Sequence, residues 1–314
     1  MKKPMIILTG PTAAGKTNLS IGLAKAINGA VISADSMQVY KKMDIGTAKI
    51  MPEEMDGVDH YLVDVLDPKE DFNVARFQEM SKEALEKIYA KGQIPIVVGG
   101  TGFYIQALLN DIQFSETEKD DSYRKELEAF AKEHGSAALH EKLAQVDPEG
   151  AKAIHMNNVK RVIRALEYYK ETGEPISKHN ERERNRKSPY NFAYFVLTHE
   201  REILYDRINK RVDLMLEQGL VEEVKALWEE GYDRSLVSMQ ALGYKEILQY
   251  LEGEISLDEA VYLLKRDTRH FAKRQLTWFG REREVIMIKK QDYKDEDEIL
   301  QIMLEEIRNR GILC

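Results

Sequence analysis

The sequence predicts an α/β protein with a mostly parallel sheet and an inserted all-helical domain. Short apolar runs alternate with helical stretches over the first hundred residues, which is typical of strands joined by crossover helices. Strand signals then disappear from about residue 120 and return in a single run at 192–197. We interpret that run as the last strand of the first sheet, so the helical stretch before it is an insertion.

The strands of the first hundred residues are predicted from four apolar runs, at 5–8, 30–33, 61–65 and 94–98. A helix is predicted at 78–91, because its apolar residues recur at helical spacing. Gly92 follows this helix as a suitable C-terminal cap before the next strand. Predicted strands and helices therefore alternate in this part of the chain.

The middle of the chain is predicted to hold three helices, at 122–134, 137–145 and 158–172. Gly135 and the Asp147–Pro148 pair supply the breaks between them. A polar stretch then leads to the returning strand.

After that strand, one or two amphipathic helices are predicted at 201–228, with an interruption near Gly219. The rest of the chain reads as helical until 285–288, a short edge strand or extended segment. We therefore expect two domains, a catalytic core of residues 1–118 and 190–314 and an inserted helical domain of residues 119–189.

The composition indicates a large core and no membrane segment. The 314 residues are 43% hydrophobic, and no apolar run approaches the ~20 residues that span a bilayer. No cleavable signal is visible, so we expect a cytoplasmic protein without a membrane contact. The single cysteine, Cys314, excludes a disulfide framework within one chain. No obligate protein partner is inferred.

The charge is unevenly distributed along the chain. A net charge of −8 argues against coating of nucleic acid by bulk electrostatics. However, Lys and Arg gather at 178–187 and at 265–283, where aromatic residues interleave with them. This pattern permits a negatively charged macromolecular partner on one face, although a solvated basic face is the simpler alternative.

A phosphate-binding loop is predicted at residues 10–17, which read GPTAAGKT between the first strand and a helix. The glycines let backbone N–H groups close around phosphate oxygens, while Lys16 supplies charge and Thr17 a hydroxyl for Mg²⁺. We expect a polyphosphate ligand there. The residues of the loop are Gly10, Pro11, Thr12, Ala13, Ala14, Gly15, Lys16 and Thr17.

A candidate acid or base follows the second strand. Asp35 lies at the carboxyl end of an apolar run, and ligands of open α/β sheets bind at that edge. Its carboxylate could hold Mg²⁺ through water or act as a general base, and Ser36 and Gln38 offer hydrogen bonds to a nucleobase. Capping of a turn by Asp35 and Ser36 is the structural alternative.

A third glycine-rich stretch, VVGGTGFYIQAL, follows the strand at 94–98 and places Thr101 at the same edge. Small residues let a substrate approach the backbone closely, although an ordinary strand-to-helix turn gives the same pattern. The strand ends in glycines and lacks the acidic residue of a usual Walker B site, which disfavours an ATP-cleaving motor.

Two arginines, Arg207 and Arg211, are four residues apart in a predicted helix and share one face. Together they could clamp a diphosphate opposite the phosphate loop. Asp206 and Asp213 could instead pair with them on a solvated face.

These stretches, with four further segments, resemble the tRNA dimethylallyltransferases nearly end to end. The segments ADSMQVYKKMDIGTAK and VGGTGFYIQALL contain Asp35 and Thr101. The others are HYLVDVLDP, IHMNNVKRVIRALEYYKETG, ALGYKEI from Ala241 and TRHFAKRQLTWFGRE from Thr268. A eukaryotic-type C-terminal zinc finger is not seen, so the chain looks like the bacterial form.

The resemblance implies a P-loop kinase-like core with an inserted domain that helps clasp the anticodon stem-loop of tRNA. It also implies transfer of a dimethylallyl group from dimethylallyl diphosphate to the exocyclic amino nitrogen of the adenosine 3′ of the anticodon. Diphosphate is then a leaving group, bound with Mg²⁺, which explains a phosphate loop without a Walker B carboxylate.

The resemblance also implies roles for single residues. Asp35, Thr101 and Arg207 are the expected catalytic residues, Arg211 joins the phosphate loop in binding diphosphate, and Thr17 is the metal ligand. The residues expected to bind tRNA are Asp35, Ser36, Met37, Gln38, Thr101, Arg124, Val159, Lys160, Arg161, Val162, Ile163, Gln240, Gly243, Lys245, Arg269, Lys273 and Arg274.

Two other functions are consistent with parts of the sequence. A P-loop small-molecule kinase accounts for residues 1–50 and leaves the insert and the basic C-terminal segment without a role. A noncatalytic RNA-binding module has no need for an intact phosphate loop beside Asp35. The sequence leaves open which tRNAs are substrates, the oligomeric state, the order of substrate binding and which of the two arginines contacts diphosphate.

Overall fold

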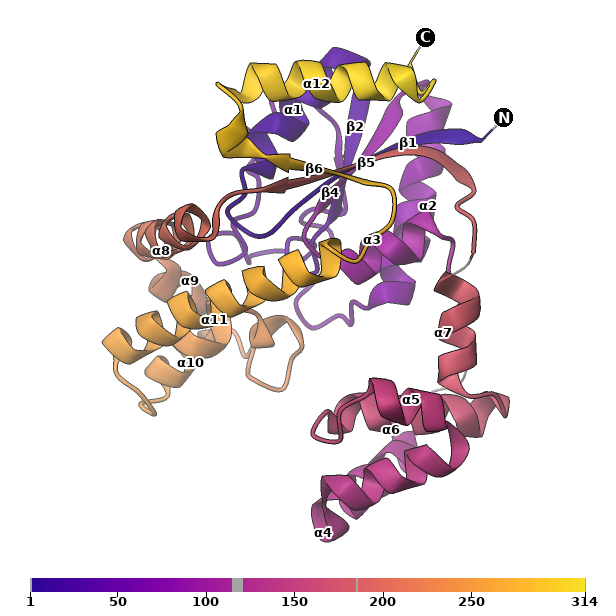
Figure 1. Cartoon of the computed structure of the whole chain (residues 1–314). Helices are drawn as coiled ribbons and strands as arrows, with labels where there is room; N and C mark the ends of the chain where they lie inside the picture. Colours follow the sequence, from indigo (N-terminus) through magenta and orange to yellow (C-terminus); the bar gives the residue numbers. More distant parts are fainter. Residues whose placement is uncertain (1, 115–120, 185, 314) are drawn as a thin grey trace. The chain divides into compact units, whose positions relative to one another are not determined.

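The structure, a computed structural model, describes residues 2–114, 121–184 and 186–313. The chain forms two compact units, whose elements are labelled in Figure 1. Unit 1 comprises residues 1–109 and 189–314, and unit 2 comprises Asn110–Ser188. Unit 2 thus begins upstream of residue 119, the predicted start of the insert.

Unit 1 is built on a sheet that has six strands among the described residues, in the order β3-β2-β4-β1-β5-β6. Every pairing in this sheet is parallel, which confirms the predicted fold class. The strands are β1 (Lys3–Thr9), β2 (Gly29–Ala34), β3 (His60–Tyr61), β4 (Ile94–Gly99), β5 (Tyr190–Thr198) and β6 (Val285–Lys289). The segment at 285–288 is therefore an edge strand.

The strand expected at 61–65 is shorter than predicted. Pairing with β2 stops at Tyr61, because the backbone turns left-handed at Leu62 and Asp64, where φ is 62° and 57°. The N–H groups of Asp64 and Val65 instead donate to the carbonyls of Gln38 and Val39. This stretch therefore packs against the loop that follows β2 and does not extend the sheet.

Both faces of the sheet are covered. The covering helices are α1 (Lys16–Ile27), α2 (Val74–Ala90), α3 (Gly102–Leu109) and α12 (Glu296–Asn309). Side chains alternate along a strand, so Ile6 and Leu8 pack with α1 and α12, whereas Met5 and Ile7 pack with α2 and α3. All four are fully buried. Helix α2 begins four residues earlier than predicted, where Asn73 caps it.

The remaining helices of unit 1 follow β5 and lie at the carboxyl edge of the sheet, where α8 and α11 contact each other (Figure 1). They are α8 (Arg201–Glu217), α9 (Leu220–Glu229), η1 (Ser238–Gln240), α10 (Tyr244–Leu251), α11 (Leu257–Phe279) and η2 (Lys290–Asp292). Gly219, with φ of 101°, separates α8 from α9. The predicted interruption near Gly219 is confirmed.

The described part of unit 2 is helical throughout its regular structure. Its elements are α4 (Asp121–Val146), α5 (Pro148–Ala153), α6 (Val159–Thr172) and α7 (Ile176–Arg184). Gly135, with φ of 84°, interrupts α4 at the predicted break. Leu139, Leu143, Val162 and Leu166 are buried between α4 and α6.

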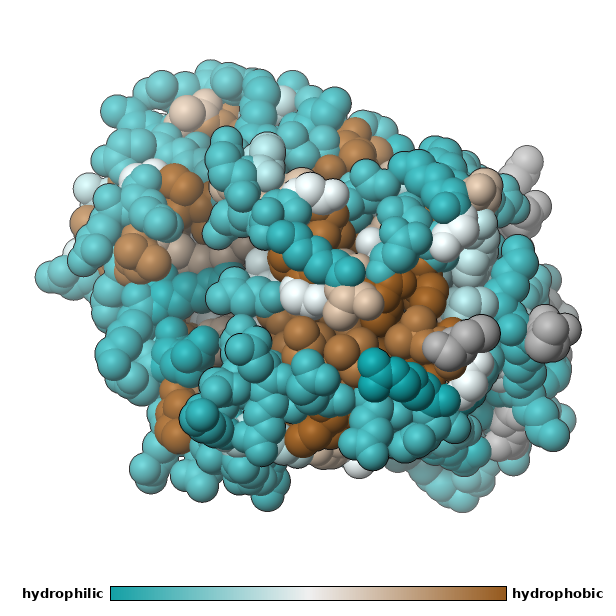
Figure 2. Space-filling view, turned by 90° about the horizontal axis from the view of Figure 1, so that it is seen from above, coloured by the Kyte–Doolittle hydropathy of each residue, from teal (hydrophilic) through white to brown (hydrophobic). Residues whose placement is uncertain are grey.

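Polar and charged residues cover most of the face shown in Figure 2, and the hydrophobic residues visible there lie mainly near its middle. Among the residues that the structure describes, no helix has the length and apolar character needed to cross a membrane.

The carboxyl ends of three neighbouring strands bring the candidate site residues together. Gly99 of β4 is in register with Thr9 of β1 on one side and with Ala34 of β2 on the other. The loops that follow these residues therefore emerge side by side at one edge of the sheet.

Candidate active site

A cavity of about 430 Å³ opens at this edge of the sheet. It is lined by Thr12, Ala13, Gly15, Lys16, Thr17, Asp35, Gln38, Thr47, Ala48, Val98, Gly99, Gly100, Arg207, Lys210, Arg211, Phe271 and Gln275. The lining comes from the phosphate loop, the segment after β2, the end of β4, and helices α8 and α11. Segments far apart in the sequence thus form one cavity.

The phosphate loop has the backbone that its sequence predicts. Ala13 and Gly15 are left-handed, with φ of 62° and 84°, so the chain turns sharply from β1 into α1. At Gly10 a side chain has no room, because an added Cβ would lie 2.3 Å from the carbonyl oxygen of Leu197. The loop therefore presents backbone N–H groups at the start of a helix, as phosphate binding requires.

Lys16 folds back onto the loop, and its Nζ donates to the carbonyls of Gly10 (3.0 Å) and Pro11 (2.9 Å). Burial and, to a smaller extent, the positive charge of Arg211 lower the pKa of Lys16 to about 8, while Asp35 opposes both effects. The ammonium is therefore poorly compensated, and an anion in the cavity would stabilise its charged form.

Both predicted arginines line the cavity. Arg207 Nε donates to the carbonyl oxygen of Ala13 (2.8 Å), which ties α8 to the phosphate loop. Burial and then the charge of Arg207 lower the pKa of Arg211, while Asp35 raises it. The alternative was that Asp206 and Asp213 form ion pairs with these arginines, but in the structure both carboxylates pair with lysines. Asp206 pairs with Lys210 and Asp213 with Lys265.

Asp35 faces the same cavity and is half-buried. Its Oδ1 accepts from the backbone N–H groups of Met37 (2.8 Å) and Gln38 (3.3 Å), as the turn-capping alternative predicted. These bonds use one carboxylate oxygen, so capping and a role toward a ligand are compatible. Ser36 and Met37 are half-buried beside it but are not among the residues that line the cavity.

Gly99 and Gly100 line the cavity beside the phosphate loop, and Thr101 is not part of the lining. The loop is closely packed, because a Cβ on Gly100 would meet Gln275 Nε2 at 2.2 Å and one on Gly102 would meet the indole of Trp278 at 2.2 Å. The backbone N–H of Thr101 donates to the carbonyl of Ala34. Its backbone thus ties β4 to β2.

Sequence reasoning missed Gln275, which joins two walls of the cavity. Its Oε1 accepts from the N–H of Thr12 (3.0 Å) and its Nε2 donates to the carbonyl of Gly100 (2.9 Å). Phe271, one helical turn earlier on α11, and Lys210, between the two arginines, were also missed. The sequence signal for Phe271 and Gln275 was their membership of the quoted segment TRHFAKRQLTWFGRE, and for Lys210 it was only its position between the two arginines.

The comparisons with known proteins agree over nearly the whole chain. The sequence model described as IPP transferase matches residues 38–283. The chain belongs to this family. It is 64% identical over 311 residues to the tRNA dimethylallyltransferase of Lachnoclostridium phytofermentans, covering 99% of each chain. It is 54% identical over 308 residues to that of Acetivibrio thermocellus, covering 98% of each.

Solved structures of IPP transferases agree with the fold. The tRNA isopentenylpyrophosphate transferase of Bacillus halodurans is 46% identical, with a TM-score of 0.73, over 99% of this chain and 98% of that one. A eukaryotic dimethylallyltransferase described as acting on tRNA is 31% identical, with a TM-score of 0.83, over 98% of this chain and 80% of that one. The family resemblance found in the sequence is confirmed.

Several residues that the IPP transferase resemblance assigns to tRNA lie on helix α11. Lys273 and Arg274 are exposed and line a second cavity of about 410 Å³, formed with His270, Thr277, Trp278 and Arg281. Arg269 instead faces α8, where its Nη1 donates to Asn209 Oδ1 (2.6 Å).

The segment around residue 240 has structural bonds of its own. Gln240 is exposed and donates to the carbonyl of Arg234, and Gly243, with φ of 95°, precedes α10. Lys245 lies near the carboxylates of Glu246 (3.3 Å) and Asp267 (3.8 Å).

In unit 2 the predicted tRNA-binding residues separate into two kinds. Lys160 and Arg161 are exposed at the start of α6, whereas the side chains of Val162 and Ile163 are buried in the core, and Val159 packs against it. The burial of these two side chains leaves Lys160 and Arg161 as the exposed charged residues of the segment that is predicted to bind tRNA. Arg124 makes a two-bond ion pair with Glu167, at 2.8 and 2.7 Å.

The residues of the cavity fit a magnesium ion that is held mainly by a ligand. Among the described residues, no group of three His, Cys, Asp or Glu side chains could hold a metal. Thr17 and Asp35 both line the cavity and offer a hydroxyl and a carboxylate. Mg²⁺ is commonly bound by one or two such oxygens together with water and substrate phosphates.

Proposed function

We propose that this IPP transferase moves a dimethylallyl group from dimethylallyl diphosphate to tRNA. The acceptor is the exocyclic amino nitrogen of the adenosine 3′ of the anticodon, and diphosphate is released. The observation that carries the proposal is the shared cavity, in which the phosphate loop and two arginines face Asp35. The family and the names of its members supply the substrate class.

The diphosphate binds at the phosphate loop in this proposal. Backbone N–H groups at the start of α1 surround its oxygens, and Lys16 turns from the carbonyls of Gly10 and Pro11 toward the added negative charge. Arg207 and Arg211 line the same cavity and stabilise the charge that develops on diphosphate in the transition state. Thr17 and water would hold Mg²⁺, which would supply further positive charge to the diphosphate.

The acceptor adenosine enters from the side of Asp35 and Gln38. Its base leaves the stack of the anticodon loop, and the amino nitrogen attacks the first carbon of the allyl group. The carbon–oxygen bond breaks with its electron pair moving to diphosphate, and Asp35 accepts the proton that the nitrogen loses. Thr101 supports this wall through its backbone bond to Ala34.

The kinase alternative is weaker than prenyl transfer. Phosphoryl transfer by a P-loop enzyme commonly uses a second acidic residue for its metal, whereas β4 ends here at Gly99 and Gly100 follows it. The chain also belongs to a family named for the transfer of a prenyl group from a five-carbon diphosphate. Since the proposed substrate is tRNA, the proposed site of action is the cytoplasm.

The decisive experiment incubates the protein with unmodified tRNA and radiolabelled dimethylallyl diphosphate. We expect label in the tRNA, confined to the adenosine 3′ of the anticodon, and none when that adenosine is replaced by guanosine. ATP with small-molecule acceptors should give no phosphorylated product. Label-free tRNA, or a phosphorylated small molecule, would contradict the proposal.

Binding of an anticodon stem-loop should weaken as salt is added. Each phosphate that Lys or Arg neutralises releases counterions, so the log–log slope should be about 0.7 to 0.9 per phosphate. Alanine at Lys160 and Arg161 together, or at Lys273 and Arg274 together, should flatten the slope and leave dimethylallyl diphosphate binding unchanged.

Lys152→Ala provides the matched control in unit 2, because Lys152 is exposed and pairs with Glu149. This variant should keep the wild-type slope. If neither double variant differs in slope from Lys152→Ala, neither the pair Lys160 and Arg161 nor the pair Lys273 and Arg274 contacts the RNA backbone.

A further inference from the structure

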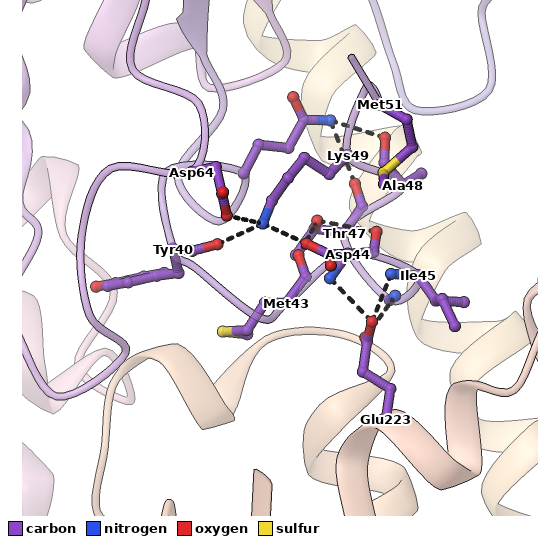
Figure 3. A network of polar contacts seen from close by, with 12 residues as sticks. Tyr40, Met43, Asp44, Ile45, Thr47, Ala48, Lys49, Met51, Asp64 and Glu223 are labelled. Carbon is purple, nitrogen blue, oxygen red and sulfur yellow. Dashed lines mark hydrogen bonds and ion pairs between the residues drawn. The ribbon is translucent and has the colours of Figure 1, made fainter. Parts of the chain in front are cut away.

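Residues 44–49, here called the 44–49 loop, form part of the cavity wall through Thr47 and Ala48. The loop is held by a carboxylate from another element, as Figure 3 shows. Glu223 of α9 accepts from three consecutive backbone N–H groups, with Oε2 bound to Asp44 (2.9 Å) and Ile45 (2.8 Å) and Oε1 to Gly46 (3.1 Å). Successive N–H groups that converge in this way form an anion-binding concavity. Here the bound anion is the carboxylate of Glu223, a residue of the same chain.

Tyr244 of α10 gives the carboxylate a further hydrogen bond. Its hydroxyl donates to Glu223 Oε1 at 2.6 Å, and the side chain is fully buried. Burial, followed by the charge of Glu223, raises the pKa of Tyr244, so the hydroxyl remains a donor. The ring packs directly on the loop, because a Cβ on Gly46 would lie 2.5 Å from it. Any larger residue at position 46 would displace the ring or the loop.

A buried lysine closes the two ends of the loop (Figure 3). Lys49 Nζ donates to the carbonyl of Tyr40 (2.6 Å), to Asp44 Oδ1 (2.5 Å) and to Asp64 Oδ1 (2.8 Å). Lys49 is 7% exposed, so its charge depends on these partners. The bond to Asp44 joins the last residue of the loop to the first. The loop therefore has a fixed shape, and Glu223 fixes its place against α9.

The loop in turn orients a side chain that faces the cavity. Gln38 Nε2 donates to the carbonyls of Thr47 (3.3 Å) and Ala48 (3.0 Å), which uses both of its amide hydrogens. The side-chain amide of Gln38 can donate to these carbonyls only when its nitrogen, and not its oxygen, points toward them. The backbone N–H of Gln38 also donates to Asp35 Oδ1. The loop thus sets the hydrogen-bonding pattern that the wall beside Asp35 presents.

We infer that Glu223 is a positioning residue for the acceptor substrate, acting through the 44–49 loop and Gln38. The inference rests on the proposed function, because it assigns this wall to the acceptor base. Glu223 itself is not among the residues that line the cavity. The phosphate loop has separate supports in Arg207 and Gln275. Loss of Glu223 should therefore affect the two substrates unequally.

The test compares Glu223→Gln, Glu223→Ala and, as a matched control, Glu222→Gln, which changes the preceding, exposed residue of α9. Small displacements of a positioned group cost up to about 10²-fold in rate. We expect kcat/KM for tRNA to fall roughly 10-fold in Glu223→Gln and up to about 10²-fold in Glu223→Ala. The side-chain amide of Glu223→Gln would keep one acceptor oxygen for the N–H groups of the loop, so this variant should lose less activity than Glu223→Ala. KM for dimethylallyl diphosphate should stay within about twofold of wild type in all three.

Hydrogen exchange supplies a readout that is independent of activity. The amides of residues 44–46 should exchange faster in both Glu223 variants, and those of α1 should be unchanged. Wild-type kcat/KM for tRNA in Glu223→Gln and Glu223→Ala would overturn the inference, as would an equal loss toward both substrates. A wild-type protein that prenylates no tRNA would instead refute the proposed function, and the exchange data would still report whether Glu223 holds the loop.

Discussion

Asp35→Asn is expected to lower the single-turnover rate of prenyl transfer by about 10² to 10⁴, the range typical of a positioned general base. The change is conservative for the fold. The amide oxygen of the variant can keep both bonds that Asp35 Oδ1 accepts from the N–H groups of Met37 and Gln38. What the variant loses is the ability to accept the amino proton. The defect should therefore lie in the chemical step.

The affinity of Asp35→Asn for tRNA and for dimethylallyl diphosphate should remain within a few-fold of wild type. Asp59→Asn is a suitable control, because Asp59 pairs with Lys91 on the surface at 2.7 Å. The measurement is rapid-quench transfer of label to tRNA with enzyme in excess. A near-wild-type rate in Asp35→Asn would remove Asp35 from proton transfer and leave it as a turn cap.

The phosphate loop and Asp35 could be predicted because their signals are local. A glycine-rich loop between a strand and a helix has one common geometry, and the structure has the expected left-handed Ala13 and Gly15. Asp35 was found because it follows a run of buried residues in β2. Parallel strands then bring the ends of β1, β2 and β4 to the same edge, so adjacency in space followed from topology.

The parts that could not be predicted depend on contacts between distant segments. Gln275 joins Thr12 to Gly100, and Glu223 holds residues 44–46, but nothing in the sequence indicates which distant residues either side chain contacts. The strand at 61–65 was overestimated because the backbone after Tyr61 bonds to the loop that follows β2 and not to the sheet. Val162 and Ile163 were predicted to bind tRNA because they lie in a segment that resembles the family. Their side chains are buried, whereas those of Lys160 and Arg161 are exposed, and the resemblance of a segment does not reveal this difference.

Lys16→Ala is expected to lower kcat/KM for dimethylallyl diphosphate by about 10² to 10³, the range for removing one preorganised donor from a developing oxyanion. The loss should be seen in both KM and kcat, because Lys16 attracts the bound diphosphate and also the charge that develops on it as it leaves. Affinity for tRNA should be unchanged. Lys25→Ala, on the same helix and paired with Asp56 at the surface, is the matched control.

Arg207→Ala and Arg211→Ala, measured in the same assay, distinguish the two arginines. A larger defect in Arg207→Ala would agree with its bond to the loop at Ala13. If Arg211→Ala alone were defective, Arg211 would be the arginine that contacts diphosphate. Normal kinetics in both would mean that neither stabilises the leaving group.

The pH dependence of diphosphate binding should identify Lys16 directly. Its pKa in the free protein is lowered to about 8, mainly by burial, and the protonated form is the one that attracts an anion. Below pH 8 the lysine is charged and affinity should be constant. Above pH 8 the free protein must take up a proton to bind, so affinity should fall by up to tenfold per pH unit, until the pKa of the complex is reached. Lys16→Ala should bind weakly at every pH and lose this dependence, whereas Lys25→Ala should retain it. A calorimetric titration that shows the same decline above pH 8 in Lys16→Ala would assign it to another group and remove Lys16 as the titrating cation of the site.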